Sequence, residues 1–398
     1  MKLANRMSRF SGSPTSALIT KVAELRKEGR DIISLNVGEP DYQTPDNIKT
    51  AGIKAIVDGF TKYTPGPGIV ELRQEISKKL LEDNGLEYNL NEICVTVGAK
   101  QAIFNAIMAT CDEGDEVIIP VPCWVSYVDM VKIANAKPIL VPVQEENGYV
   151  LDIEAIKAAV TPNTRAIIIC TPNNPTGAVY SKESLEQLVN IACENDFWVI
   201  TDEIYEKLIY DDNKHVSCAS VSKKAWEHTI TVNGFSKAYS MTGWRVGYAA
   251  GPKQVIDAMK SLQSQMTSAT SGISQKAATV ALTGSQHDIE VMVEAFKKRR
   301  EYVVNRLNSI KGLSCSTPAG AFYIMVDVSY YLGKKYNEYE IKTAMDLANY
   351  ILDTVNVAVV PGEAFFTSGK IRISYSNSME NLDKALSRVE ETISKLHN

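Results

Sequence analysis

The sequence contains no long apolar run and no large excess of charge of either sign. No segment approaches the roughly 20 apolar residues that span a bilayer. The first 13 residues are polar and basic, without the apolar core of a signal peptide. The net charge of −5 gives no reason to expect nucleic acid or an anionic membrane as a partner. We therefore expect an ordinary globular protein that binds neither.

The sequence also lacks the cysteine and histidine patterns of metal and disulfide proteins. Its seven cysteines are dispersed and none forms a CxxC pair, which indicates a reducing compartment and argues against a zinc site or a disulfide framework. The four histidines are isolated, and no HExxH pattern occurs. A metal hydrolase or a Ser-His-Asp enzyme has little support. We therefore expect a cytoplasmic protein without a bound metal.

The middle of the chain alternates between strand and helix patterns. Short, continuously apolar runs rich in Val and Ile are typical of strands that are buried on both faces. Such runs lie at residues 93–97, 116–119, 138–143, 166–170, 197–201, 229–232 and 246–248. The alternation predicts an α/β fold, with an open and mostly parallel sheet covered by helices. Ligands of such sheets bind beyond the carboxyl ends of the strands.

The length of 398 residues and a change of pattern near residue 287 indicate a second, smaller domain. A long charged helix is predicted at residues 288–309, and strands are predicted after it at 321–326, 357–360 and 370–375. Near the other end of the chain, a short strand is predicted at residues 32–37.

One loop carries a lysine and an arginine eight positions apart, Lys237 and Arg245, among small and hydroxyl residues. A lysine amine can bond an aldehyde, and an arginine can hold a phosphate with two parallel hydrogen bonds. Pyridoxal phosphate carries both groups, and its ring accepts electrons. The alternative is a surface loop with two solvated cations, and the spacing alone leaves both interpretations open.

Other polar residues also follow predicted strands. Gly98, Ala99 and Lys100 lie at a turn from strand to helix. The backbone N–H groups there can bind a phosphate, or the segment is a simple turn. Asp202 ends a strand, where a buried carboxylate needs a partner such as a protonated ring nitrogen. Tyr205 follows three residues later and can point toward the same ligand.

Three further residues have two interpretations each. Trp124 can stack on an aromatic cofactor ring or belong to the core or an interface. Asn174 lies in an Asn-Pro turn and can also donate a hydrogen bond to a ring oxygen. Arg372 alternates with isoleucines in a predicted strand, so it is either an exposed strand residue or a clamp for a carboxylate.

Together and in this order, these residues resemble the motifs of the class I aminotransferases of fold type I. The resemblance covers nearly the whole chain, and within this family it is greatest to the bacterial aspartate aminotransferase branch that includes bifunctional aspartate/prephenate enzymes. The residues that carry it are 38–41, Tyr63, 98–100, Trp124, Asn174, Pro175, Gly177, Asp202, Tyr205, Ser236, Lys237, Arg245 and Arg372.

The resemblance implies pyridoxal 5′-phosphate as the cofactor. The residues implied to bind it are Tyr63, Gly98, Ala99, Lys100, Trp124, Asn174, Asp202, Tyr205, Ser236, Lys237 and Arg245. Among these, Lys237, Asp202 and Tyr205 are the implied catalytic residues, with Lys237 bonded to the cofactor. Tyr63 is implied to reach the phosphate from the second subunit of a homodimer.

The resemblance further implies an enzyme that transfers the amino group of an L-amino acid, with aspartate as the first choice, to 2-oxoglutarate. The implied substrate-binding residues are Gly38, Lys100, Trp124, Asn174 and Arg372. The implied division of the chain is an N-terminal arm and part of the small domain at 1–45, a large domain with a seven-stranded sheet at 46–286, and a C-terminal α+β domain at 287–398.

Two stretches depart from the pattern of relatives. Residues 262–273 contain no Arg or Lys, whereas many aspartate aminotransferases bind the distal carboxylate there with an arginine of the other subunit. In the branch that this chain resembles, Lys100 takes that role. Residues 11–14 contain no cation, whereas prephenate-active members carry a lysine there. The alternatives are an aminotransferase for alanine, aromatic amino acids or prephenate, a lyase or decarboxylase on the same fold, and a regulatory binding protein.

Overall fold

The structure, a computed structural model, describes residues 1–10, 12 and 14–397. In this part of the chain the largest sheet has seven strands in the order β2-β8-β7-β6-β5-β3-β4. The strands are β2 (Ile93–Thr96), β3 (Glu116–Val121), β4 (Lys137–Pro142), β5 (Thr164–Cys170), β6 (Trp198–Asp202), β7 (Thr229–Gly234) and β8 (Gly247–Ala250). The strands β3 to β7 run parallel, and β8 runs antiparallel to β7 and β2. The predicted α/β fold with a mostly parallel sheet is therefore confirmed.

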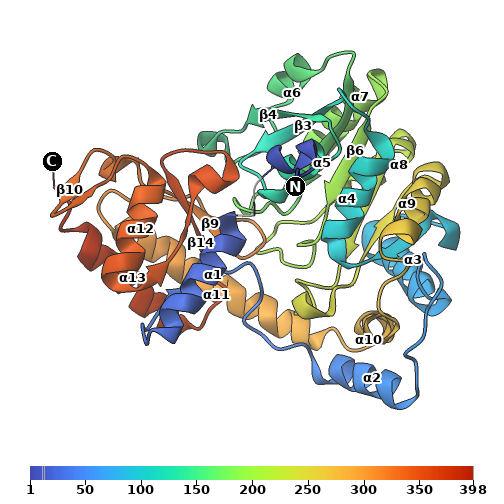
Figure 1. Cartoon of the computed structure of the whole chain (residues 1–398), viewed down its shortest axis with the longest axis horizontal. Coiled ribbons are helices and arrows are strands. Elements are labelled where there is room, and N and C mark those ends of the chain that lie inside the picture. The colour runs from blue at the N-terminus through green and yellow to red at the C-terminus, as the bar shows by residue number, and fades with distance from the viewer. Residues whose placement is uncertain (11, 13, 398) are drawn as a thin grey trace.

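Helices cover both faces of this sheet because its central strands are apolar on both sides. In β5, Ile168 packs in one cluster with residues of α4 (Gly98–Thr110), α5 (Ser126–Ile133) and α9 (Lys253–Met266). Its neighbours Ile167 and Ile169 pack in another cluster with α6 (Ile153–Ala159), α7 (Lys182–Glu194) and α8 (Lys223–His228). Figure 1 shows α4 and α9 in front of the sheet and α6 and α7 at its upper end. The alternation of side chains along a strand thus produces three layers.

The other large helices lie beside the sheet or away from it. These are α1 (Pro14–Lys27), α2 (Asp46–Val57), α3 (Val70–Asn84), α10 (Gly272–Thr283), α11 (His287–Ser309), α12 (Ala344–Val355) and α13 (Met379–Ile393). A smaller antiparallel sheet, in the order β13-β14-β9, packs with α11 to α13. Its strands are β9 (Tyr323–Asp327), β13 (Val360–Pro361) and β14 (Lys370–Ser374). A short hairpin joins β10 (Lys335–Tyr336) and β11 (Tyr339–Glu340).

The N-terminal segment packs against this C-terminal part. The strand β1 (Ile33–Ser34) pairs in parallel with β12 (Val357–Ala358), and Val22 of α1 lies in a cluster with Leu352 of α12. Figure 1 shows α1, in blue, among the orange and red C-terminal helices. The strand expected at residues 32–37 has only two paired residues, because its partner β12 is equally short. The division into domains at residues 45 and 286 stays a prediction.

None of the helices in residues 1–10, 12 and 14–397 is both long and apolar enough to cross a bilayer.

Candidate active site

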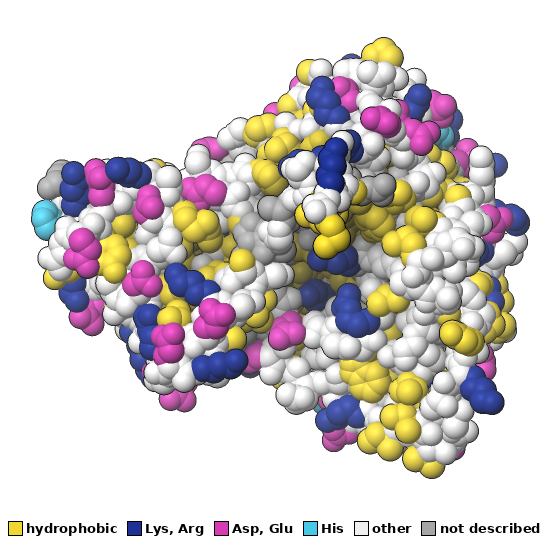
Figure 2. Space-filling model, viewed as in Figure 1, with side chains coloured by type: hydrophobic (Ala, Val, Ile, Leu, Met, Phe, Trp, Pro, Cys, Tyr) yellow, Lys and Arg dark blue, Asp and Glu magenta, His cyan; other side chains and the backbone are white. Residues whose placement is uncertain are grey.

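A cavity of about 320 Å³ opens at the carboxyl ends of β5 and β6 and beside the loop after β7. Figure 2 shows a hollow near the middle of the displayed face, with Lys and Arg side chains inside it. The predicted site residues that line the cavity are Gly38, Ala99, Lys100, Trp124, Asn174, Asp202, Tyr205, Ser236, Lys237, Arg245 and Arg372. The register of the parallel strands brings some of these residues together. Asp202 at the end of β6 pairs with Cys170 of β5 and with Val232 of β7, so the segments that follow these strands begin side by side.

Lys237 lies in the loop between β7 and β8. Its Nζ donates a hydrogen bond to the backbone oxygen of Gly38 at 2.5 Å. Burial lowers the pKa of this lysine to about 8, although the carboxylates of Glu39 and Asp202 oppose the shift. A lower pKa leaves more of the amine neutral near pH 7, and the neutral amine is the form that acts as nucleophile or base. Lys237 is therefore not a solvated surface cation.

Asp202 places an almost fully buried carboxylate at the end of β6, with 4% of the residue exposed. Its Oδ2 accepts a hydrogen bond from the Tyr127 hydroxyl at 2.7 Å, and its Oδ1 accepts one from the backbone N–H of Ile204 at 3.2 Å. Burial raises the pKa of Asp202 to about 6, and these two hydrogen bonds oppose the rise. No ion pair joins it to any other described residue. A buried, unpaired carboxylate suits a cationic ring nitrogen as its partner.

The amino end of α4 faces the same cavity. The N-cap residue Val97 makes no side-chain cap hydrogen bond, and the first N–H groups of a helix have no partner within the helix. Nη1 of Arg245 donates to the backbone oxygen of Thr242 at 2.8 Å. Gly98 has a φ of 76°, and a Cβ added there would lie 2.4 Å from Nη2 of Arg245. The amino end of α4, the guanidinium of Arg245 and the hydroxyl of Ser236, which lines the same cavity, together form a site that suits a phosphate.

Arg372 lies on β14 with 3% of the residue exposed, so it is not the exposed strand residue that the alternation allowed. Nη1 donates to Oδ1 of Asn174 at 3.0 Å, and Nη2 donates to the backbone oxygen of Asn36 at 2.9 Å. Its Nε is buried and has no hydrogen-bond partner among the described residues. Burial lowers the pKa of Arg372. A buried guanidinium without a carboxylate partner is a ready site for one.

Aromatic rings form another wall of the cavity. The Nζ of Lys100 lies 4.9 Å from the centroid of the Trp124 ring, and the Trp124 and Tyr127 rings meet edge to face at 5.3 Å. Trp124 thus lines the cavity and packs on a neighbour, and its stacking on a cofactor ring stays a prediction. The Tyr205 hydroxyl is buried and lies 3.0 Å from the hydroxyl of Tyr323.

Two of the predicted residues lie outside the cavity lining. Gly98 is next to it and contacts Arg245, as described above. Tyr63 precedes α3, is 96% exposed and does not line the cavity. Its proposed contact with a second subunit stays a prediction.

The structure also shows site residues that sequence reasoning did not single out. Tyr127 binds Asp202, Tyr323 binds Tyr205, and Glu39 accepts a hydrogen bond from the Thr242 hydroxyl at 2.8 Å. Glu39 was only part of the 38–41 motif. For the two tyrosines no local pattern marked a role, because their partners lie 75 and 118 residues away along the chain.

The stretches that depart from the relatives have different outcomes. Residues 262–273 form the end of α9 and the start of α10, and none of them lines the cavity, whereas Lys100 does. Within the stretch 11–14, Ser11 and Ser13 lie outside the described residues. Thr15 and Ile19 of α1 line the cavity, so this helix contributes to its entrance.

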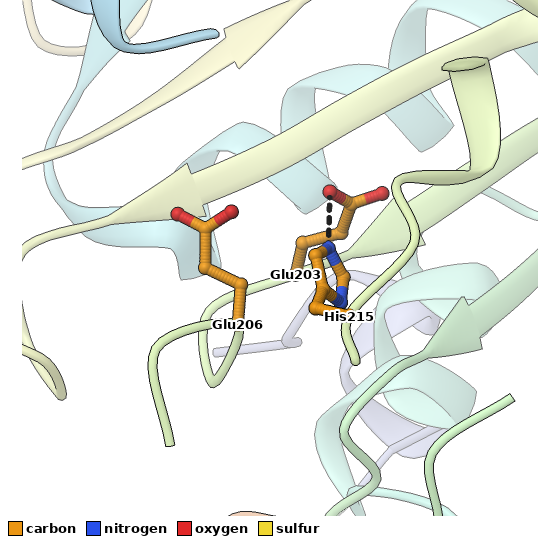
Figure 3. Close-up of side chains that lie close together, drawn as sticks. All are labelled: Glu203, Glu206 and His215. Atoms are coloured by element: carbon orange, nitrogen blue, oxygen red, sulfur yellow. Dashed lines mark hydrogen bonds and ion pairs between the residues drawn. The ribbon is translucent and has the colours of Figure 1, made fainter. Parts of the chain in front are cut away.

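Behind the cavity wall, Glu203, Glu206 and His215 offer ligand atoms within 4.8 Å of one another. Figure 3 shows the Glu203 carboxylate facing the His215 ring, and the two groups are 3.0 Å apart. The Glu206 carboxylate forms an ion pair with Lys79 and accepts a hydrogen bond from Asn84. Lys79 already supplies the positive charge that a metal ion would bring, and its charge disfavours a second cation there. We therefore interpret the cluster as an internal charge network.

The sequence model of the family named aminotransferase class I and II matches residues 30–389. A probable aspartate/prephenate aminotransferase of Rickettsia conorii is 45% identical to this chain, over 98% of each protein. A bifunctional aspartate aminotransferase and glutamate/aspartate-prephenate aminotransferase of Petunia hybrida is 43% identical, over 99% of this chain and 83% of its own length.

Solved structures of aspartate aminotransferases are also similar to this chain over nearly its full length. The aspartate aminotransferase of Rhizobium meliloti superimposes with a TM-score of 0.96 at 43% identity, over 100% of both chains. The aspartate aminotransferase of Thermus thermophilus with maleate superimposes with a TM-score of 0.93 at 43% identity, over 98% of this chain and 100% of that one. The similarity therefore extends over the seven-stranded sheet, the three-stranded sheet and the cavity that residues of both line.

Proposed function

This chain belongs to the class I and II aminotransferases, and we propose that it transfers the amino group of aspartate to 2-oxoglutarate. The observation that supports aspartate is that two cationic side chains, Arg372 and Lys100, line different walls of the cavity. Arg372 is buried on β14 without a carboxylate partner among the described residues, and Lys100 lies in the first turn of α4. Aspartate and 2-oxoglutarate each carry two carboxylates, so each can engage both cations. The names of the similar proteins support the same choice.

Aminotransferases of this family use pyridoxal phosphate, which supplies an aldehyde for an amine and a ring that accepts electrons. The residues of the cavity fit this group. Asp202 offers an unpaired buried carboxylate to the ring nitrogen, and Arg245 with the amino end of α4 offers an anion site to the phosphate. Trp124 offers a ring face, Tyr205 and Asn174 offer hydrogen-bond donors, and Lys237 offers the amine.

The roles of the chain's own residues in the reaction follow from their surroundings. Arg372 holds the α-carboxylate of the substrate, with Asn174 fixing the guanidinium, so the carboxylate is retained and the Cα–H bond is presented. Lys237 then takes the proton from Cα as the general base. Its pKa of about 8 leaves part of the amine neutral at pH 7 to 8. Lys100 holds the distal carboxylate.

The proposal includes a homodimer in which Tyr63 completes the phosphate site of the second subunit. Tyr63 is a large side chain that is 96% exposed and lies in the loop between α2 and α3, just before the run of Pro and Gly at residues 65–68. Sedimentation of the purified protein tests the dimer. Tyr63→Phe should weaken cofactor binding about fivefold, the effect of one lost hydrogen bond, without changing the mass of the assembly.

A cytoplasmic location is part of the same proposal. All seven cysteines are free thiols, and five of them are buried. This agrees with a reducing compartment.

Prephenate is a second candidate substrate, because names of similar proteins include it. The lack of a cation at residues 11–14 of the sequence opposes this candidate, since the prephenate-active members of the family carry a lysine there.

The test is a panel of amino donors and oxo acids given to the purified enzyme loaded with pyridoxal phosphate. We expect oxaloacetate from aspartate and 2-oxoglutarate, with kcat/KM at least about tenfold above that for alanine, tyrosine or prephenate. Lys237→Ala is the control, since it keeps the cavity and removes the amine. A higher kcat/KM for one of the other substrates would overturn the assignment of aspartate. Release of pyruvate with ammonia, or of CO2, without an acceptor would identify a lyase or decarboxylase.

A further inference from the structure

Tyr323 is a cavity residue for which the proposed reaction provides no role. It is the first residue of β9, is almost fully buried and lines the cavity. Opposite it on β14 lies Ser374, and Arg372 is two residues from Ser374 on the same face. A diagonal neighbour on an antiparallel pair is within reach of an aromatic side chain. Tyr323 therefore lies where it can act on the carboxylate clamp.

The ring of Tyr323 holds one side of that clamp. The Cζ of Arg372 lies 4.4 Å from the Tyr323 ring centroid and 4.8 Å from the centroid of Phe365. Two rings at these distances confine the plane of a guanidinium and interact with its charge. The hydrogen bonds of Arg372 to Asn174 and Asn36 fix its ends, and the rings fix its tilt.

The hydroxyl of Tyr323 forms a hydrogen bond with a different residue, Tyr205. It lies 3.0 Å from the hydroxyl of Tyr205, and both side chains are buried. Each hydroxyl has one proton to donate. If Tyr205 donates its proton toward a ligand in the cavity, Tyr323 must donate to the oxygen of Tyr205. Burial raises the pKa of both phenols, which keeps both protons in place.

We propose that Tyr323 is a positioning residue with two separable tasks: its ring orients Arg372 for the substrate carboxylate, and its hydroxyl donates to the oxygen of Tyr205 and so strengthens the hydrogen bond that Tyr205 donates to the cofactor ring oxygen. This inference rests on the proposed function, since it assigns Tyr205 to the cofactor and Arg372 to the substrate. The two tasks belong to different atoms of one side chain. Substitutions can therefore separate them.

The experiment compares Tyr323→Phe, which removes only the hydroxyl, with Tyr323→Leu, which also removes the ring. Both are measured as holoenzymes, by kcat and KM for whichever amino acid the wild type uses best. We expect Tyr323→Phe to keep KM within about twofold, because its ring still holds Arg372. We expect the same variant to lower kcat, because the hydroxyl that contacts Tyr205 is lost. We expect Tyr323→Leu to raise KM about tenfold, the loss expected of a buried cation–π contact.

The absorbance of the bound cofactor between pH 5 and 9 supplies a readout that needs no substrate. A donor on the ring oxygen stabilises the deprotonated form of the chromophore. Tyr323→Phe should therefore move the titration midpoint upward, by about half a pH unit to one unit for one hydrogen bond. In a Tyr205→Phe background the same substitution should move it no further, because the hydroxyl acts through Tyr205.

Tyr350→Phe is the matched control. Tyr350 is a buried tyrosine of α12 whose hydroxyl donates to the backbone oxygen of Thr392 at 2.9 Å, and it does not line the cavity. Its loss should leave the midpoint and KM unchanged. A shift that persists in the Tyr205→Phe background, an unshifted midpoint in Tyr323→Phe, or an equal rise of KM in both Tyr323 variants would overturn the proposal. If Tyr323→Leu does not fold, the titration of the Phe variants still decides. Failure of the wild type with aspartate would overturn only the proposed substrate.

Discussion

Tyr127 and Asp202 share a hydrogen bond of 2.7 Å although 75 residues separate them along the chain. Tyr127 belongs to α5 and Asp202 ends β6, so the bond joins a helix on one face of the sheet to the edge where the cavity opens. Since Oδ1 of Asp202 also accepts a hydrogen bond from the backbone N–H of Ile204, the two bonds together fix the orientation of the carboxylate beside the cavity.

The first prediction concerns the charge of Asp202. Asp202→Asn keeps the shape of the side chain and a hydrogen-bond acceptor for Tyr127, but removes the partner of the ring nitrogen. We expect kcat to fall about 100- to 1000-fold, as for the loss of a preorganised electrostatic contact. Tyr127→Phe should cost only about fivefold, as one neutral hydrogen bond. Steady-state kinetics with saturating cofactor measure both, and a loss below about tenfold for Asp202→Asn would contradict the assigned role.

The second prediction concerns the stability of the apoprotein. The pKa of Asp202 is about 6 in the folded protein against 3.8 as the ordinary value, so stability falls as the pH rises from about 4 to 6, and the loss is complete above pH 6. Asp202→Asn should therefore stabilise the apoprotein at pH 7, by up to about 3 kcal/mol for a shift of about two units. The gain should shrink as the pH falls from 6 toward 4, where the carboxyl is protonated in both states.

Urea unfolding of cofactor-free protein at several pH values measures this effect. In protein saturated with the cofactor, Asp202→Asn should instead lower the free energy of unfolding at pH 7, because the charge of Asp202 then has a partner. If Asp202→Asn destabilised the apoprotein at pH 7, the Asp202 carboxylate would already have a charge partner without the cofactor.

The third prediction separates the two carboxylate sites. Lys100→Ala should raise KM for aspartate about tenfold and leave KM for alanine unchanged, because alanine has no distal carboxylate. Arg372→Lys should raise KM for both amino acids, because a lysine cannot present a planar fork between Tyr323 and Phe365. Initial rates with the two donors measure the difference. Equal responses of aspartate and alanine to Lys100→Ala would place the distal contact elsewhere.

The fourth prediction uses two glycines with similar, positive φ angles. Gly98 has a φ of 76° and a new Cβ would lie 2.4 Å from Arg245, whereas Gly85 has a φ of 66° and open space around it. Both Ala variants should lose about 1 kcal/mol of stability from backbone strain. Only Gly98→Ala should also weaken cofactor binding, by about tenfold or more, because the guanidinium must move away from the helix end. Cofactor titration followed by absorbance compares them, and equal affinities would contradict a phosphate site at α4.

Local sequence patterns were sufficient to predict the sheet. The run at 166–170 is apolar at every position and the run at 197–201 at every position but Thr201, and such runs are stable only when both faces are covered. The strand at 32–37 was predicted too long, because its extent depends on a two-residue partner more than 300 residues away. Strand ends are set by pairing, which local composition does not report.

The order of chemically distinctive residues along the chain was enough to indicate the family, and with it a lysine, an acid and two arginines that gather in one cavity. For Asp202 and Lys237 this succeeded because parallel strands bring their carboxyl ends to one edge, so residues that follow different strands meet there. Arg372 lies on β14 of the smaller antiparallel sheet, and only its place in the family's order of residues predicted that it joins them. Which tyrosines support them was decided only by tertiary structure. Tyr127 and Tyr323 have ordinary local contexts, and their roles arise from burial beside Asp202, Tyr205 and Arg372, a relation between distant segments that no local pattern encodes.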